Sequence, residues 1–247
     1  MKEHPLSNNH VTRQGARRSR GALWLIPLVL VAVAGGLFMT ANSFRPHTRA
    51  AFAEALNNAR QVKLALDGFA EDFGGCYPDR LTGRALGLEA YGFESSNDYF
   101  RQLFAAEETA FETLFWVKDS KLCGRRPDNR IRSSEALDPS RILAPGEVHW
   151  AYLTGQRRDG EPSRPLVMDS FLPGTTAFDP KLWDRKVIVV RIDSSTTGLR
   201  MRLDDDTIRD GMGKDLLSPE AEPWKGSGLD PRGLLVQPEP APKGKNR

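Results

Sequence analysis

Few residues of this 247-residue chain have the type and spacing that chemistry needs, and His149 is the first of them. It lies in residues 147–153 (EVHWAYL), a stretch that predicts a strand. A general base at this position needs an acid partner and a pocket, and Asp169 is the carboxylate that would serve. No serine stands in a Gly-x-Ser-x-Gly turn, and no phosphate-binding glycine loop is present. A structural or surface histidine is therefore the favoured alternative.

Asp204, Asp206 and Asp210 belong to the most acidic stretch of the chain, which Gly211 follows. Calcium takes six to eight oxygen ligands, so clustered carboxylates beside a glycine turn could hold it. The spacing does not match an EF-hand loop, and a solvated acidic turn is the favoured alternative. Two cysteines and four scattered histidines do not form a zinc-binding pattern. Calcium is thus the one metal candidate, and no other cofactor is expected.

A long amphipathic helix is predicted to begin near Thr48 and to stop at Gly74-Gly75. Its apolar positions recur every three or four residues, which is typical of one buried helix face. The opposite, polar face is predicted to carry Glu54, Lys63 and Asp67 among others. The residues expected to pack this helix on a sheet are Phe52, Leu56, Ala59, Leu66 and Phe69.

Most predicted strands follow this helix late in the chain, so the fold class is α+β with a small antiparallel sheet. They cover residues 147–153, 165–168, 186–192 and 198–203, and an earlier apolar run, 113–117, suits a buried strand. A second helix is predicted over residues 97–105, capped by Asn97. Residues 218–247 are rich in proline and glycine and predict a flexible tail, in which Trp224 is the candidate for packing back.

Residues 21–41 (GALWLIPLVLVAVAGGLFMTA) contain no charged side chain and are long enough to cross a membrane as a helix. We interpret them as a retained single-pass anchor, a cleaved signal peptide being the alternative. Residues 1–20 are basic, which places them in the cytoplasm by the positive-inside rule. The domain of residues 42–217 would then lie in the periplasm of a bacterium. The rest of the chain is close to neutral, so nucleic-acid binding is not expected.

Cys76 and Cys123 would both lie on the periplasmic side, which is oxidising. A Cys76–Cys123 disulfide is the favoured interpretation, with two free thiols as the alternative.

Residues 58–66 (NARQVKLAL), then 69–72 (FAED), Gly74-Gly75 and Tyr77-Pro78 resemble the end of the long helix in type II secretion pseudopilins and type IV pilin-like proteins. Residues 96–104, 146–152 and 187–199 are similar to later segments of the same group. The resemblance implies a long helix packed on a small antiparallel sheet. It also implies a non-enzymatic role through contacts with the membrane and with other pilin-like or secretion-assembly subunits.

One departure concerns the segment that begins the anchor. Pilins carry a glycine before a cleavage site and a glutamate five residues into the mature chain, whereas here Ala22 and Pro27 occupy those places. A frame that starts from Gly21 restores the glycine but puts Ile26 at the position of the glutamate. The resemblance therefore does not extend to the signals for processing and filament stacking. Two alternatives stay open, a tethered binding or sensor module without filaments and a tethered enzyme built around His149 and Asp169. No small-molecule substrate is indicated.

Overall fold

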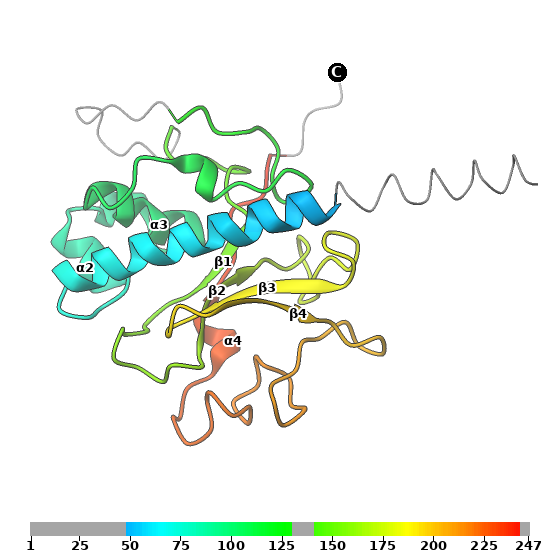
Figure 1. Ribbon diagram of the computed structural model, residues 1–247. Coiled ribbons are helices and arrows are strands. Elements are labelled where there is room, and N and C mark those ends of the chain that lie inside the picture. Colours follow the sequence, from blue (N-terminus) through cyan, green and yellow to red (C-terminus); the bar gives the residue numbers. More distant parts are fainter. Residues whose placement is uncertain (1–47, 130–140, 243–247) are drawn as a thin grey trace, which may run out of the picture. The chain divides into compact units, whose positions relative to one another are not determined.

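A helix over residues 48–72 lies along one face of a five-stranded antiparallel sheet (Figure 1). The computed structural model describes residues 48–129 and 141–242. The strands are β1 (Trp150–Leu153), β2 (Pro165–Asp169), β3 (Lys186–Arg191), β4 (Thr196–Arg200) and β5 (Leu235–Val236), in the order β4-β3-β2-β1-β5. The predicted α+β class with an antiparallel sheet is confirmed.

The remaining helices are short. They are α2 (Arg80–Ala85), α3 (Ser96–Ala105) and α4 (Pro231–Leu234), with 3₁₀ turns η1 (Glu89–Tyr91) and η2 (Glu112–Leu114). Ser95, not the predicted Asn97, is the N-cap of α3, where it forms a capping box with Asp98. Asn97 instead donates its side-chain amide to the Leu143 carbonyl, 2.8 Å away.

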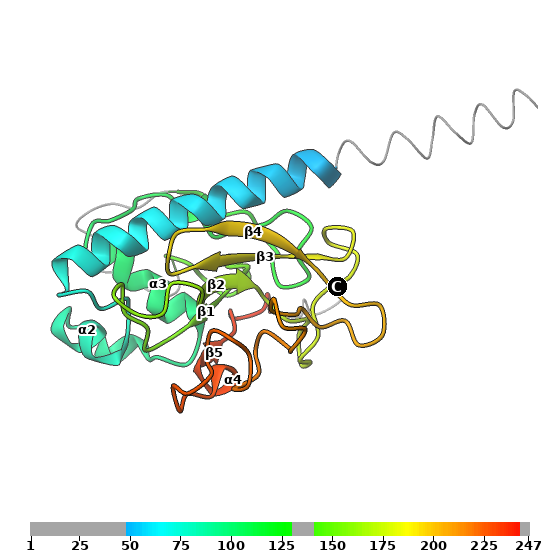
Figure 2. The same ribbon diagram turned by 60° about the horizontal axis from the view of Figure 1, so that its bottom comes forward.

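Both faces of the sheet are buried, as the alternation along β1 shows. Trp150 and Tyr152 belong to the core on the side of the long helix, whereas Ala151 and Leu153 belong to a second core. The second core is covered by the C-terminal part of the chain, which includes Trp224 (Figure 2). A strand places successive side chains on opposite faces. The long helix and α3 therefore contribute to the core on one face of the sheet, and the C-terminal part of the chain contributes to the core on the other.

The long helix packs through the face that its sequence pattern indicates. Ala59, Leu66 and Phe69 are fully buried in the first core, and Phe52 and Leu56 pack against it. Gly198 in β4 allows this approach, since a Cβ atom there would lie 2.6 Å from the Phe52 ring.

The C-terminal segment contradicts the prediction of a flexible tail as far as it is described. Trp224 packs back onto the domain, as predicted: it is 1% exposed, and its indole N–H donates to the Leu216 carbonyl at 2.9 Å. β5 pairs with β1, and the backbone of Ala241 donates to the Leu122 carbonyl at 3.0 Å. The proline- and glycine-rich composition of this segment predicted a tail without structure. A two-residue strand and single backbone hydrogen bonds need few apolar residues, so composition does not exclude them.

The apolar run 113–117 is not a strand, so that prediction is wrong. Residues Glu112–Leu114 form η2, and the Phe115 N–H closes the turn on the Glu112 carbonyl at 2.9 Å. Phe115 and Val117 are nevertheless buried, which explains the apolar composition of the run. An apolar run of this length shows burial but does not distinguish a strand from a buried turn.

Within residues 48–129 and 141–242, no helix is long and apolar enough to cross a membrane. The predicted anchor, residues 21–41, and the basic segment before it lie outside the described residues.

Candidate functional site

His149 and Asp169, the predicted acid–base pair, are brought together at one end of β1 and β2. His149 Nε2 lies 2.8 Å from Asp169 Oδ1, and His149 Nδ1 lies 2.8 Å from Ser120 Oγ. Ser120 was not predicted, and no sequence motif marks it. The three side chains thus form a Ser–His–Asp chain of hydrogen bonds, which makes them the first candidate for catalysis.

The geometry of this group favours a structural role. In a hydrolytic triad the aspartate binds Nδ1 and the serine binds Nε2, but here the two nitrogens are exchanged. His149 is 2% exposed and Asp169 4%, so a substrate cannot reach the imidazole. Asp169 also accepts the Ile188 backbone N–H at 2.8 Å, which ties β2 to β3. The buried network therefore fastens the sheet to the loop that contains Ser120.

Lys63 forms a second polar cluster, on the face of the long helix that packs on the domain. Its Nζ lies 2.5 Å and 2.6 Å from the two Asp67 oxygens, 3.1 Å from Ser194 Oγ and 3.3 Å from Tyr77 Oη. Lys63 is only 2% exposed, so its predicted place on the solvent face is wrong. The i,i+4 spacing of Lys63 and Asp67 was the available signal for the ion pair.

Two effects act on the Lys63 ammonium in opposite directions. Burial lowers the pKa of Lys63, and the ion pair with Asp67 raises it by a smaller amount. Burial also raises the pKa of Tyr77, whose hydroxyl donates to Asp67 at 3.0 Å. Ser194 stands at the tip of the β3–β4 hairpin with a φ of 66°, a conformation that a serine rarely adopts. The cluster therefore clamps the hairpin tip to the helix.

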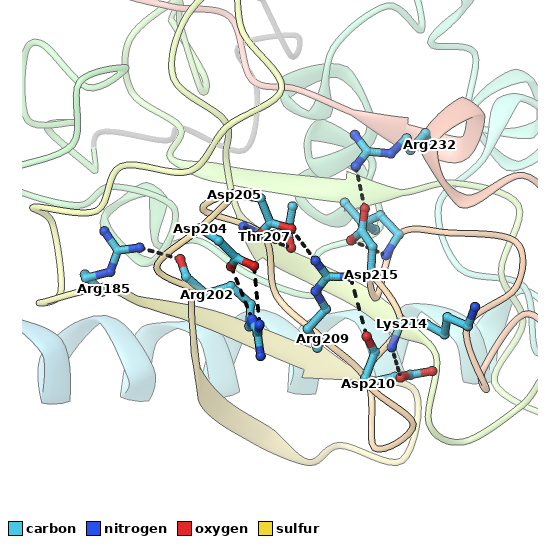
Figure 3. A network of polar contacts seen from close by, with 12 residues as sticks. Arg185, Arg202, Asp204, Asp205, Thr207, Arg209, Asp210, Lys214, Asp215 and Arg232 are labelled. Carbon is cyan, nitrogen blue, oxygen red and sulfur yellow. Dashed lines mark hydrogen bonds and ion pairs between the residues drawn. The ribbon is translucent and has the colours of Figure 1, made fainter.

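The calcium candidates do not converge on a common point. Asp204 pairs with Arg202 at 3.2 Å, and Asp206 pairs with Arg185 at 2.5 Å. Asp210 accepts backbone N–H groups of its own loop, including that of Lys214 at 2.8 Å (Figure 3). Among the described residues, no three His, Cys, Asp or Glu side chains are grouped to hold a metal ion. The arrangement supports the alternative of a solvated, arginine-paired acidic turn.

The predicted disulfide is wrong, because Cys76 and Cys123 are both free thiols. Cys76 follows the long helix and lies 2.9 Å from an Arg157 guanidinium nitrogen. Cys123 precedes Gly124, whose N–H binds the Gly146 carbonyl. Burial raises the pKa of the Cys123 thiol. Cysteine spacing alone could not supply the geometry that a disulfide needs.

A pocket of about 40 Å³ lies between the first turns of the long helix and two loops. The helix contributes Ala51, Glu54, Ala55 and Asn58. One loop contributes Trp116 to Asp119, and the other contributes Trp183, which is 4% exposed. No sequence motif marks this site, because its residues are distant along the chain.

The solvent-facing side of the long helix is a further candidate surface. Asn57, Arg60, Gln61 and Leu64 are exposed there, and Leu64 is 68% exposed. An isolated exposed leucine is common on protein surfaces and identifies no partner by itself. Leu64 lies, however, on a helix that follows a membrane-length apolar segment in the sequence, where an exposed apolar residue is a candidate contact for another subunit.

Comparisons with protein-family models, with curated proteins and with solved structures found no match to this chain.

Proposed function

We propose that this protein is a non-enzymatic, single-pass membrane protein with a pilin-like periplasmic domain. In this proposal it is a structural or accessory component of a type II secretion or type IV pilus-like assembly in the bacterial inner membrane. The observation that carries the proposal is the long helix, residues 48–72. It follows the apolar segment 21–41 in the sequence, buries one face against an antiparallel sheet and leaves the other face to solvent.

The buried polar groups support a non-enzymatic role. His149 is enclosed by protein, and Lys63 is held by Asp67 as an ion pair. An enzyme needs its acid or base within hydrogen-bond reach of a bound substrate. Both groups are buried, at 2% exposure each, and both connect separate elements of the domain.

The apolar segment supports an accessory role over that of a bulk filament subunit. Residues 21–41 contain no carboxylate, and Pro27 stands where pilins carry a glutamate. A carboxylate in the membrane costs a few kcal/mol, so proteins keep one there only when it has a function. Contacts in an assembly would then depend on the exposed helix face.

A tethered binding module that forms no filament is the second candidate function. The pocket beside Trp116 and Trp183 favours this second function. A protein that serves only as a filament subunit does not need a pocket lined by polar and aromatic residues.

The proposal can be tested by cross-linking in membranes. The background variant carries Cys76→Ser and Cys123→Ser, and Leu64→Cys is added to it. We expect oxidation to yield dimers of this chain through position 64, while Met212→Cys, at an exposed site in a loop on the other side of the sheet, yields none. Absence of dimers with Leu64→Cys, despite expression in the membrane, would favour the binding module.

A further inference from the structure

β4 is an outermost strand of the sheet, and its outer edge is open (Figure 2). Just after β4, the Met201 N–H donates to the Arg185 carbonyl at 2.8 Å, in continuation of the β3–β4 pairing. In an antiparallel ladder, every second residue of a strand bonds to a given neighbour. The residues of β4 that alternate with this bonded set, Thr196, Gly198 and Arg200, therefore direct their backbone N–H and carbonyl groups away from β3.

These outward backbone groups have no hydrogen-bond partner among the described residues, and Gly198 and Arg200 are exposed. The opposite side of the sheet is different, because just after β5 the Gln237 carbonyl accepts the Ser96 N–H of α3 at 3.0 Å. Proteins usually shorten, bend or block an open edge, since a row of unpaired backbone groups accepts another strand. β4 instead pairs with β3 in unbroken register over its five residues and contains no proline.

The long helix forms a wall beside this edge. The Phe52 ring lies over Gly198, where a Cβ atom would be 2.6 Å away. Further along the helix, Asp67 accepts from Ser194 Oγ at the hairpin tip at 3.2 Å. Arg60 lies seven residues before Asp67, and residues seven apart share one side of a helix. The exposed Arg60 thus stands on the side of the helix that borders β4.

Basic side chains without a carboxylate partner surround the edge. Lys186 and Arg200 are directly opposite in the β3–β4 register, and Lys186 Nζ lies 5.1 Å from the centroid of the Phe52 ring, on the helix side of the sheet. Like charges directly opposite in a sheet are destabilising. Neither of these side chains, nor Arg60, makes an ion pair among the described residues. By contrast, Arg202, two residues after β4 ends, pairs with a carboxylate at 3.2 Å.

We infer that the edge of β4 binds an acidic segment of a partner protein in extended conformation, as an additional strand of the sheet. The partner's backbone completes the hydrogen bonds of the edge. Its carboxylates neutralise Lys186, Arg200 and Arg60, which explains why two cations stand opposite each other without a partner. This inference goes beyond the proposed assembly role, because it specifies one site and the chemistry of its ligand.

Charge distinguishes this occupant from a second copy of the chain. Two β4 strands paired edge to edge bring the same basic side chains of both copies into one interface. The Asp67 carboxylate on this side of the helix is already held by Lys63 and does not compensate them. A repulsive element against one partner creates preference for another, so the edge stays open to a strand of opposite charge. A lipid headgroup supplies negative charge but no row of amide groups to complete the ladder.

Peptide binding to the full-length protein in phosphatidylcholine nanodiscs provides the test. The probe is the dye-labelled peptide Thr-Glu-Val-Glu-Val-Glu-Thr-amide, whose carboxylates fall on one face of a strand. One control peptide replaces each Glu by Gln, and the other replaces both Val by Pro, which keeps the charge but prevents strand pairing. We expect fluorescence anisotropy to show that the probe binds at least about fivefold more tightly than either control.

Variants of the edge sharpen the result. Arg200→Gln and Lys186→Gln should each weaken binding of the probe about two- to fivefold, the range for an exposed ion pair. Thr196→Pro removes one outward N–H and should weaken binding about two- to tenfold, the contribution of one hydrogen bond. Lys225→Gln, at an exposed lysine beside the second core, is the matched control and should change nothing. A melting temperature no lower than that of the unchanged protein shows that a variant is folded.

Three outcomes with the peptides would overturn the inference. The probe fails to bind, or the proline peptide binds as tightly as the probe, or Arg200→Gln has no more effect than Lys225→Gln. Two further arms identify another occupant. If nanodiscs with one copy each associate in sedimentation and Thr196→Pro abolishes the association, a second copy occupies the edge. If phosphatidylglycerol vesicles bind in a manner that depends on Arg200 and the probe does not bind, the ligand is a lipid headgroup.

Discussion

Lys63→Met tests whether the buried ion pair fastens the β3–β4 hairpin to the long helix. The change removes the ammonium that contacts Asp67, Ser194 and Tyr77, and it leaves the Asp67 carboxylate without its cation. Removal of one partner from a fully buried pair costs about 3–5 kcal/mol. The Asp67 side chain is 19% exposed, so water recovers part of the loss. We expect a decrease in the free energy of unfolding of about 2–3 kcal/mol.

The assay is guanidinium unfolding of the full-length protein, followed by tryptophan fluorescence. Adding Asp67→Asn to Lys63→Met should restore about 1 kcal/mol or more, because the uncompensated charge is then removed. Arg60→Met, on the exposed side of the same helix, is the control and should change stability by less than about 0.5 kcal/mol. If Lys63→Met behaves like Arg60→Met, or the two changes at positions 63 and 67 are simply additive, the clamp does not exist.

Three further predictions concern the core, a buried acid and the C-terminal segment. Leu66→Asp places a charge at a fully buried helix position and should unfold the domain; an unchanged melting temperature would mean that the helix face is assigned wrongly. Burial raises the pKa of Glu112, so its contribution to stability is present below about pH 4.3 and is lost as the pH rises through the raised value. Glu112→Gln keeps an acceptor for the Leu143 N–H and should raise stability at pH 7 but not at pH 4, as melting curves at the two pH values would show. Truncation after Gly233 removes β5 and should lower the melting temperature, whereas a flexible tail could be removed without effect.

Periodicity predicted the elements that position the site, because those elements are built from repeated apolar residues. β3 was predicted from its apolar run and its hairpin spacing to a second strand, and α3 was placed within one residue of its start. That second strand was placed too late in the chain: β4 covers Thr196–Arg200 instead of residues 198–203, and Leu203, which was expected on its half-buried face, is 85% exposed. The long helix shows its buried face through Ala59, Leu66 and Phe69. These features depend on local pattern, which the sequence carries directly.

The site residues were harder to predict because contacts between distant segments decide them. Lys63 has the spacing of a solvent-facing residue, but the domain folds over it and supplies Tyr77 and Ser194 as partners. His149 and Asp169 were predicted as a possible acid–base pair, and the structure pairs them. The sequence did not show that both side chains are buried. Trp116 and Trp183 meet at one pocket only because the fold brings their loops together.

The most direct test of the proposed function is a cysteine scan along residues 57–66 of the long helix, with cross-linking in membranes and in the background that lacks Cys76 and Cys123. The account predicts that dimer yield follows the helical period. Positions 57, 60, 61 and 64 should give high yields, and the buried positions 59, 62 and 66 should give low yields. A flat profile, or no dimer at any position, would contradict a role in which like helices meet through this exposed face.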